Sequence, residues 1–336
     1  MKSHTVKHKP MFCKQNIMTV ALCASLAVLG ACSSSDDGNG DAAVDLSAFN
    51  FNASNSTIAA EIAAAAMSFF PGYNEIGQRV LTILTTSEPN NSPFDLMLCM
   101  PGGDSILSWT DTDTSGDLSV GDTASLQFTS CDTEGLGETI TGSVDIVATS
   151  GIPNNLGYTL GYTVAVNLTI SLVPETTTIL ANFKATTSTP DLFNFTNVYM
   201  ADDVSSQTLT VTENGTEYFK LGCFNVIHTF DAAGIVGGNY DLAPSGAIVA
   251  SNKVLSLAGG PAVSFIDDDM NSGTQRLLSV SQPNCASIGS PGGVADSDGS
   301  YMEMEALGGG NLRLHTFDIN NAETSSVDTT WEALTD

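Results

Sequence analysis

Strict alternation of apolar and polar residues is the sequence feature that most restricts how this chain can fold. From Tyr162 to Leu172, every even-numbered residue is large and apolar, and every odd-numbered residue is small or polar. Because successive side chains of a β-strand point to opposite faces, this period of two predicts a strand with one buried face and one solvated face. At about 3.3 Å per residue, such a strand is roughly 36 Å long.

The same alternation recurs along much of the chain after residue 104, for example in residues 139–146 and 208–212. Asn214-Gly215 separates two β-rich runs, which is the strongest short-range signal for a hairpin. Strands with one solvated face are typical of antiparallel sheets. The sequence therefore predicts an all-β, mainly antiparallel fold with a long curved sheet, open or closed into a clam or half-barrel. A two-sheet β-sandwich is the alternative.

Two short helices are expected before the strands. Apolar residues recur at helical spacing between residues 58 and 84, and many of the others are alanine, the best helix former. Pro71-Gly72 interrupts this pattern, so we expect one helix at about 56–70 and a second at about 74–86. Basic residues are nearly absent from both, which indicates packing against the concave face of the sheet rather than membrane binding.

The N-terminal residues have the composition of a signal peptide. Four lysines and no acidic residue precede an apolar run from Ile17 to Leu29, which is shorter than the roughly 20 residues that span a bilayer. The run ends in Leu29-Gly30-Ala31-Cys32, which resembles the lipobox of Gram-negative bacterial lipoproteins. The resemblance covers residues 1–32. It implies cleavage before Cys32 and acylation of Cys32, with enough acyl chains to hold the protein stably to a lipid bilayer.

This resemblance gives the expected organisation of the chain. Residues 1–31 form the signal peptide, and residues 32–57, rich in Ser, Asp, Asn, Gly and Ala, form the lipidated cysteine and a flexible tether. Residues 58–336 form a single β-rich domain that begins with the helices. Ser33 resembles the residue that follows the cysteine in outer-membrane lipoproteins, so we expect a lipoprotein of the cell envelope, at the outer membrane.

Four cysteines follow Cys32 in the sequence. In an oxidising envelope, four thiols indicate two disulfides, for which three connectivities exist. We expect the sequential pairs Cys99–Cys131 and Cys223–Cys285, because each would staple a local segment. The run from Cys99 to Cys131, with its Gly-Gly and Asp-rich loop, resembles a pattern in uncharacterised bacterial lipoproteins, which implies no activity.

Residues 111–122 fit the pattern of a calcium-binding loop. Ca²⁺ takes six to eight oxygen ligands, and a glycine at position 6, here Gly116, allows the tight turn that brings them together. The candidate ligands are Asp111, Asp113, Ser115, Asp117 (through its backbone carbonyl), Ser119 and Asp122. The loop resembles EF-hand-like or dockerin-like loops over these 12 residues. It departs from them in ending on aspartate rather than glutamate and in having strand-like flanks. The alternative is an acidic turn without an ion, and any bound calcium is expected to be structural.

Charge excludes some classes of partner. The chain has 10 Lys+Arg and 37 Asp+Glu, and the signal peptide contains four of the basic residues and none of the acidic ones. Residues 33–336 therefore have six basic and 37 acidic residues, a formal charge of −31. Such a surface disfavours nucleic acid and anionic lipid head groups, which bind to positive patches.

Motifs of catalysis are absent from the sequence, including G-x-S-x-G, H-E-x-x-H, the P-loop and G-x-G-x-x-G. Only His228 and His315 follow the signal peptide, each in a strand-like context. The leading hypothesis is a non-enzymatic envelope lipoprotein with a structural role or an apolar or carbohydrate ligand. Two alternatives are a hydrolase of polysaccharide or another polymer, and a surface adhesin module stiffened by calcium. An enzymatic function is thus left open and not favoured.

Overall fold

The structure is a computed structural model of the chain. The residues it describes are 46–86, 93–99, 102–116, 118–132, 137–150, 158–189, 194–202, 204–231, 239–280, 285–290, 294 and 296–335. The predicted signal peptide, the predicted lipidation site Cys32 and the first part of the predicted tether therefore lie outside the described residues.

Strands dominate the described part of the chain. The first ten are β1 (Ser47–Ala48), β2 (Phe94–Asp95), β3 (Gly102–Thr110), β4 (Thr123–Asp132), β5 (Thr139–Ser150), β6 (Tyr158–Leu172), β7 (Glu175–Thr189), β8 (Asn194–Met200), β9 (Thr208–Glu213) and β10 (Thr216–Asp231). The rest are β11 (Tyr240–Ala250), β12 (Lys253–Leu257), β13 (Val263–Ile266), β14 (Asp269–Ser272), β15 (Thr274–Ser279), β16 (Tyr301–Gly308), β17 (Asn311–Phe317) and β18 (Glu323–Thr330). The helices are α1 (Ser56–Thr86), the 3₁₀ turn η2 (Ala286–Ile288) and α2 (Trp331–Thr335).

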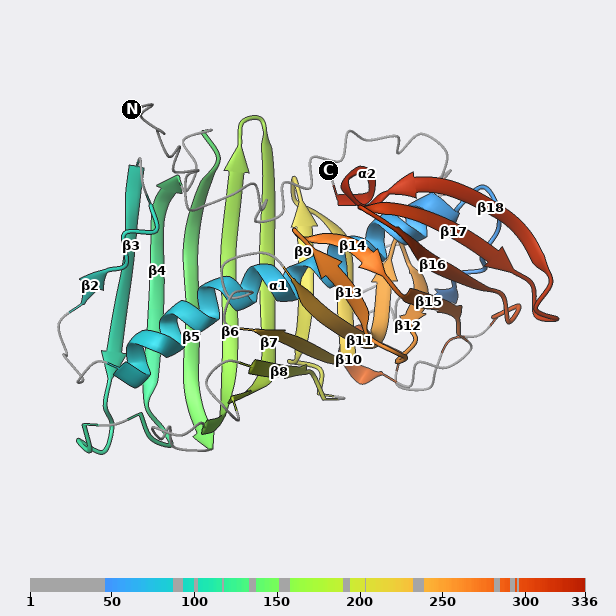
Figure 1. Ribbon diagram of the computed structural model, residues 1–336. Coiled ribbons are helices and arrows are strands. Elements are labelled where there is room, and N and C mark those ends of the chain that lie inside the picture. Colours follow the sequence, from blue (N-terminus) through green and yellow to red (C-terminus); the bar gives the residue numbers. More distant parts are fainter. Residues whose placement is uncertain are drawn as a thin grey trace, which may run out of the picture.

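All 18 described strands belong to one sheet. Neighbouring strands are antiparallel, except that β1 pairs with β12 in parallel. From β2 to β7 each strand pairs with the next in sequence, and β8 and β9 then share the free edge of β7 and both pair with β10. Beyond β10 the sheet curls into a partial ring, and α1 contacts both β10 and β17 (Figure 1). The prediction of a mainly antiparallel, curved sheet is confirmed, and the two-sheet sandwich is not the arrangement found.

The strand with the clearest alternation lies at the centre of the flat part of the sheet. β6 and β7 pair over 15 residues without a register shift, from Tyr158 opposite Thr189 to Leu172 opposite Glu175. The large apolar residues of β6 from Leu160 to Ile170 are at most 5% exposed and belong to the main core. The Asn214-Gly215 hairpin is also confirmed, and it joins β9 to β10. Both of its residues have positive φ, 48° and 82°, as a tight two-residue hairpin requires.

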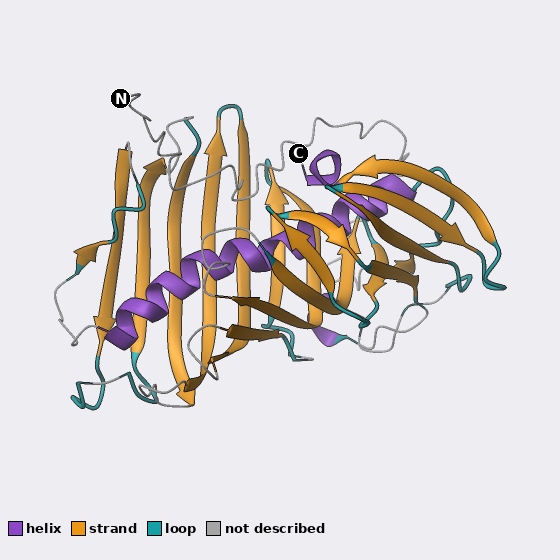
Figure 2. Ribbon diagram, viewed as in Figure 1, coloured by secondary structure: helices purple, strands orange, loops and turns teal. Residues whose placement is uncertain are grey.

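α1 is one continuous helix of 31 residues that includes Pro71, so the prediction of two short helices was wrong (Figure 2). Proline inside a helix removes one hydrogen bond and costs about 3 kcal/mol. Here Phe69, Phe70 and Tyr73, on either side of the proline, are all buried in the core. Burial of three aromatic side chains offsets the cost of the proline, which is how tertiary packing overrides helix propensity.

The N-terminal half of α1 is buried on nearly all sides. Six alanines between Ala59 and Ala66 are at most 2% exposed. A helix that is apolar around its circumference belongs in an interior rather than on a surface. The small alanine side chains let strands approach α1 closely. The helix fills the concave side of the sheet and is buried around most of its circumference, not along one apolar stripe only.

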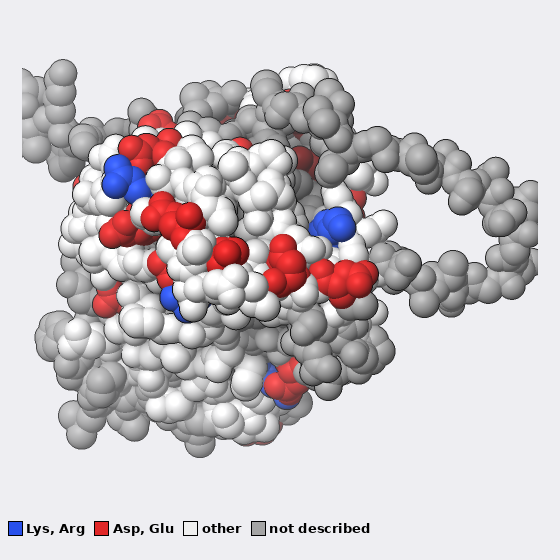
Figure 3. Space-filling view, turned by 90° about the vertical axis from the view of Figure 1, so that its right-hand side faces the viewer, with Lys and Arg blue, Asp and Glu red and all other residues white. Residues whose placement is uncertain are grey.

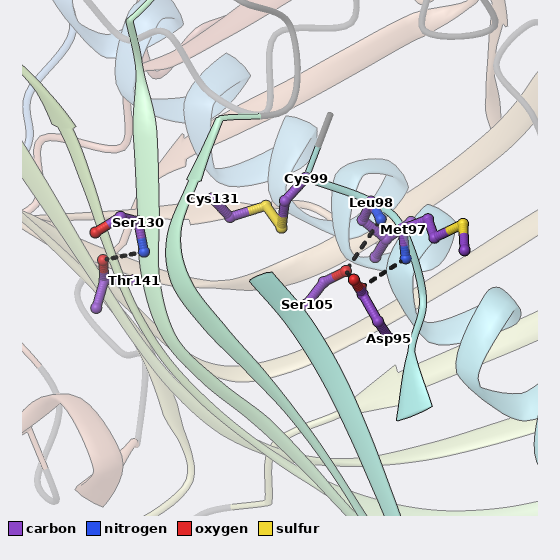
Figure 4. The surroundings of a disulfide bond; sticks show 8 residues. All are labelled: Asp95, Met97, Leu98, Cys99, Ser105, Ser130, Cys131 and Thr141. Carbon is purple, nitrogen blue, oxygen red and sulfur yellow. Dashed lines mark hydrogen bonds between the residues drawn. A yellow bond between two sulfur atoms is a disulfide. The ribbon is translucent and has the colours of Figure 1, made fainter. Parts of the chain in front are cut away.

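The first disulfide secures the edge of the sheet. Cys99, in the segment between β2 and β3, is bonded to Cys131 in β4, with an S–S distance of 2.05 Å (Figure 4). In the same segment, the Leu98 backbone N–H donates to Ser105 Oγ at 3.0 Å. β2 pairs with β3 at only two positions, so the disulfide adds a covalent tie where strand pairing is sparse.

The second disulfide joins Cys223 of β10 to Cys285, immediately before η2. Both cysteines pack in a small core separate from the main one, together with Val254 and Ile288. Both predicted pairs are thus confirmed. Two disulfides in a chain of this size indicate an oxidising, extracytoplasmic location.

Part of the predicted tether is packed against the sheet. Ser47–Ala48 form β1, which pairs with Lys253 and Val254 of β12. Phe49 and Phe51 are buried and belong to the main core. Their apolar side chains, which the polar composition around them obscured, bring the chain into the fold before α1 begins.

Acidic side chains outnumber basic ones on the described part of the face near β18 (Figure 3). On β15–β18 the basic residues are each paired with an acid: Arg276 with Glu303 and Arg313 with Asp328.

Among the described helices, none combines the length and the apolar run that a membrane span needs.

Candidate metal centre

The predicted calcium loop connects β3 to β4 at the lower end of these strands in Figure 1. Its flanks are strands, as their alternation predicted. Two apolar residues fix the loop to the fold: Trp109 at the end of β3 and Leu118 within the loop are 5% and 4% exposed, and both belong to the main core. The loop is therefore anchored from inside, while the side chain of Asp113 is exposed to solvent.

Three of the predicted ligands converge. Asp111, Asp113 and Asp122 each offer a carboxylate oxygen, and these oxygens all lie within 4.8 Å of one another. Asp111 is half-buried, Asp113 is exposed and Asp122 is 1% exposed. A partly buried triad of aspartates of this kind could hold a metal ion, because hard cations prefer carboxylate oxygens.

Backbone amides hold the buried carboxylate of Asp122 in place. Its Oδ1 accepts a hydrogen bond from the Thr112 N–H at 2.8 Å, and its Oδ2 accepts one from the Ser119 N–H at 2.7 Å. The Ser119 hydroxyl also lies 3.2 Å from Oδ2. Asp122 thus closes the loop by joining its two ends, and its charge is partly compensated by amide dipoles.

The other two carboxylates are oriented by the turn around Gly116. Asp111 Oδ2 accepts from the Gly116 N–H at 2.9 Å, and Asp113 Oδ1 accepts from the Ser115 N–H at 3.0 Å. Ser119 Oγ donates to Asp113 Oδ2 at 2.9 Å. Hydrogen bonds from Ser115 and Ser119 lower the pKa of Asp113 to about 2, so this carboxyl is ionised at neutral pH.

The sequence pattern missed the contact that ties the loop to the sheet. The Gly121 N–H donates to the Ala148 carbonyl, and the Ala148 N–H donates to the Asp122 carbonyl, both at 2.9 Å. Ala148 is near the end of β5, so the loop docks on β5 as well as on its own two strands. Alanine offers only backbone groups here, and no side-chain signal in the sequence could have indicated this contact.

The remaining predicted ligands have different positions. Ser119 contributes its hydroxyl to the hydrogen bonds of the triad, whereas Ser115 contributes its backbone N–H to both Asp111 and Asp113. Asp117 lies outside the described residues. The triad is therefore assembled from positions 1, 3 and 12 of the predicted loop.

His315 lies between two glutamates on the outer face of the curled end of the sheet. Its Nδ1 is 3.0 Å from Glu323 Oε1, and its Nε2 is 3.1 Å from Glu305 Oε2. Partial burial acts to lower the pKa of His315, but the hydrogen bonds to Glu323 and Glu305 outweigh it and raise the pKa overall. Each ring nitrogen faces its own carboxylate, which is the geometry of a surface ion pair.

Two glutamates bear on the hypothesis of a hydrolase. Glu61 of α1 and Glu213 at the end of β9 both have a raised pKa, in each case mainly through burial, and both raise the pKa of Tyr218. Burial shifts the pKa of structural carboxylates as well as of catalytic ones. We therefore assign no catalytic role to this pair.

Comparisons with known proteins give no relative for this chain: no family model, no curated protein and no solved structure matches it.

Proposed function

We propose that this protein is a membrane-anchored envelope lipoprotein with a non-enzymatic, structural role. The observation that carries the proposal is the pair of closed disulfides, Cys99–Cys131 and Cys223–Cys285, in a chain that begins with a lipobox-like signal peptide. The disulfides indicate an oxidising compartment, and the predicted signal peptide would export the chain to one. The concave side of the sheet is packed with α1, which favours a structural role over storage of an apolar ligand in that place.

Acylation of Cys32 is the first prediction of this proposal. In the native host, the mature chain should begin at Cys32, carry acyl mass on that residue and sediment with the outer membrane. Cys32→Ala should abolish the acyl mass and the sedimentation with the outer membrane, because the sulfur of Cys32 is the proposed attachment point of the lipid. Mass spectrometry of the N-terminal peptide and membrane fractionation measure both results.

Cys23→Ala is the matched control for this experiment, since it removes a cysteine of the same apolar run without touching the lipobox. This variant should be acylated and membrane-bound like the natural chain. A natural chain that starts at another residue, or that starts at Cys32 without acyl mass, contradicts the proposal.

We further propose that Asp111, Asp113 and Asp122 bind Ca²⁺ and that the bound ion stiffens the β3–β4 loop. The supporting observations are the all-oxygen donor set, the loop spacing and the burial of Asp122. A doubly charged cation at this point offsets the repulsion among the three carboxylates, which lie within 4.8 Å of one another. Its role is to fix the end of the β3–β4 hairpin against β5.

Calcium should therefore raise the thermal stability of the protein. With a dissociation constant of about 0.1 mM, typical of extracellular sites, 5 mM Ca²⁺ stabilises the folded state by about 2 kcal/mol. Scanning calorimetry in 5 mM Ca²⁺ and in chelator measures this shift, and titration calorimetry gives the affinity. Asp113→Asn should weaken calcium binding about tenfold or more, because it removes one of three charges.

Asp104→Asn is the control for that variant. Asp104 is an exposed acid in β3, so its loss changes the net charge equally but leaves the triad intact, and the calcium response should persist. An unfolding midpoint that stays constant from chelator to 5 mM Ca²⁺ excludes the site.

A further inference from the structure

A layer of polar side chains is buried between α1 and the sheet. Asn197 of β8 is fully buried, and its Nδ2 donates to Asn74 Oδ1 of α1 at 2.5 Å and to the Tyr199 hydroxyl at 2.9 Å. Gln78 Nε2 of α1 donates to Asn197 Oδ1 at 3.3 Å. These groups satisfy one another, as buried polar groups in native proteins do.

His228 of β10 lies beside this layer, but aromatic rings rather than hydrogen-bonding groups surround it. Its side chain points to the concave side and is 1% exposed. Its ring is 4.8 Å from that of Phe230, 5.0 Å from that of Tyr240 in β11, and 6.5 Å from that of Tyr199 in β8, measured between centroids. Tyr199 in turn packs on Phe70 of α1 at 5.3 Å, so one aromatic ring separates the histidine from the central helix.

Among the residues that the structure describes, neither ring nitrogen of His228 has a hydrogen-bond partner. In the described part of the chain, the titratable groups whose rings pack on it are Tyr199 from β8 and Tyr240 from β11. Both stay neutral because burial raises their pKa. Asp268 and Asp269 act on Tyr240 but are not among the causes of the shift at His228, which is burial alone. A proton on this ring would therefore be an uncompensated buried charge, which proteins avoid.

We propose that His228 is an acid-sensitive switch in this fold: its protonation loosens the packing of β8, β10 and β11 on α1 at mildly acidic pH. The enclosure of an unpartnered imidazole, one ring away from the central helix, is the geometry that carries the proposal. Acid would charge the ring only if the aromatic layer around it opens to water. The device is independent of Cys32 and of the metal centre.

The sign of the pH dependence follows from linkage. Burial lowers the pKa of His228 to about 3 in the folded state, whereas an unfolded histidine titrates near 6.5. Between these values the unfolded or opened state binds more protons. The stability that neutral His228 contributes is thus complete above pH 6.5 and is lost as the pH falls toward 3. At pH 4.5 this effect multiplies the unfolding constant about 100-fold relative to pH 7.5.

His228→Leu tests the switch in the purified full chain. Denaturant titrations at pH 7.5 and 4.5 give the ratio of the two unfolding constants for each protein. The ratio should be about 100-fold larger in the natural chain than in the variant, whatever the variant does to stability at pH 7.5. Hydrogen exchange at pH 5 should locate the opening in β8, β10 and β11 of the natural chain. His228→Asn, which is neutral and smaller, replaces the leucine variant if the latter does not fold.

His315→Gln is the matched control, because it removes the other histidine of the folded part. The pKa of His315 is raised, so its contribution is present at low pH and lost at high pH. Its removal should leave the acid response in place or steepen it. If the folded His228 variant shows the pH dependence of the natural chain to within about threefold, the switch does not exist.

Discussion

Replacing Cys223 and Cys285 by serine should lower the free energy of unfolding by about 4 kcal/mol. The disulfide closes a loop of 62 residues, and cross-linking a loop of that length removes the corresponding conformational entropy from the unfolded chain. The bond also holds η2 against β10, where a Cβ placed on Gly222 would lie 2.3 Å from Ser287 Oγ. Because η2 and β10 are packed this closely, any movement of η2 after loss of the disulfide would disrupt their contact.

Equilibrium denaturation of the oxidised protein and of the double variant measures this loss. The Cys99→Ser, Cys131→Ser double variant should lose slightly less, because its loop spans 32 residues. Both variants should have a denaturant slope at least as steep as that of the natural chain if their folded states are intact, because an unfolded chain without the cross-link exposes more surface. Equal unfolding midpoints for the oxidised natural chain and the Cys223/Cys285 variant would show that this disulfide is dispensable.

What the sequence predicted well has a local physical cause. The alternation in β6 reports which face of one strand is buried, and Asn214-Gly215 reports the positive φ values of one turn. The disulfide pairs followed from the same reasoning, since each joins cysteines whose segments pack together within one part of the sheet. The three converging aspartates could be predicted from the sequence because a single loop of 12 residues contains them all.

What the sequence could not predict depends on distant parts of the chain. Pro71 interrupts a helical pattern locally, and only the aromatic side chains packed on either side of it show why α1 continues. Ala148 binds the loop through its backbone. His228 fits the apolar–polar alternation like any other strand residue. The strands β8 and β11, which pair with β10, enclose its ring without offering its nitrogens a hydrogen bond from the described residues. No local sequence pattern encodes this pairing.

Phe183→Ala should destabilise the protein by about 3–5 kcal/mol, the cost of emptying a large, well-packed site. Phe183 of β7 is fully buried. Its ring lies 5.3 Å from that of Tyr73, 5.9 Å from that of Tyr199 and 6.1 Å from that of Phe224, in edge-to-face arrangements. The site thus joins α1 to three strands, and truncation leaves a cavity that the rigid sheet and helix cannot close.

Asn182→Ala is the control for this variant, because Asn182 precedes Phe183 on the same strand and is exposed on the opposite face. A surface substitution there should change stability by no more than about 0.5 kcal/mol. The contrast between adjacent residues separates the loss of core packing from the general effect of placing alanine in this strand. A Phe183 variant no less stable than the Asn182 variant would mean that α1 is not packed on β7 as described, and that the concave side of the sheet is open to other occupants.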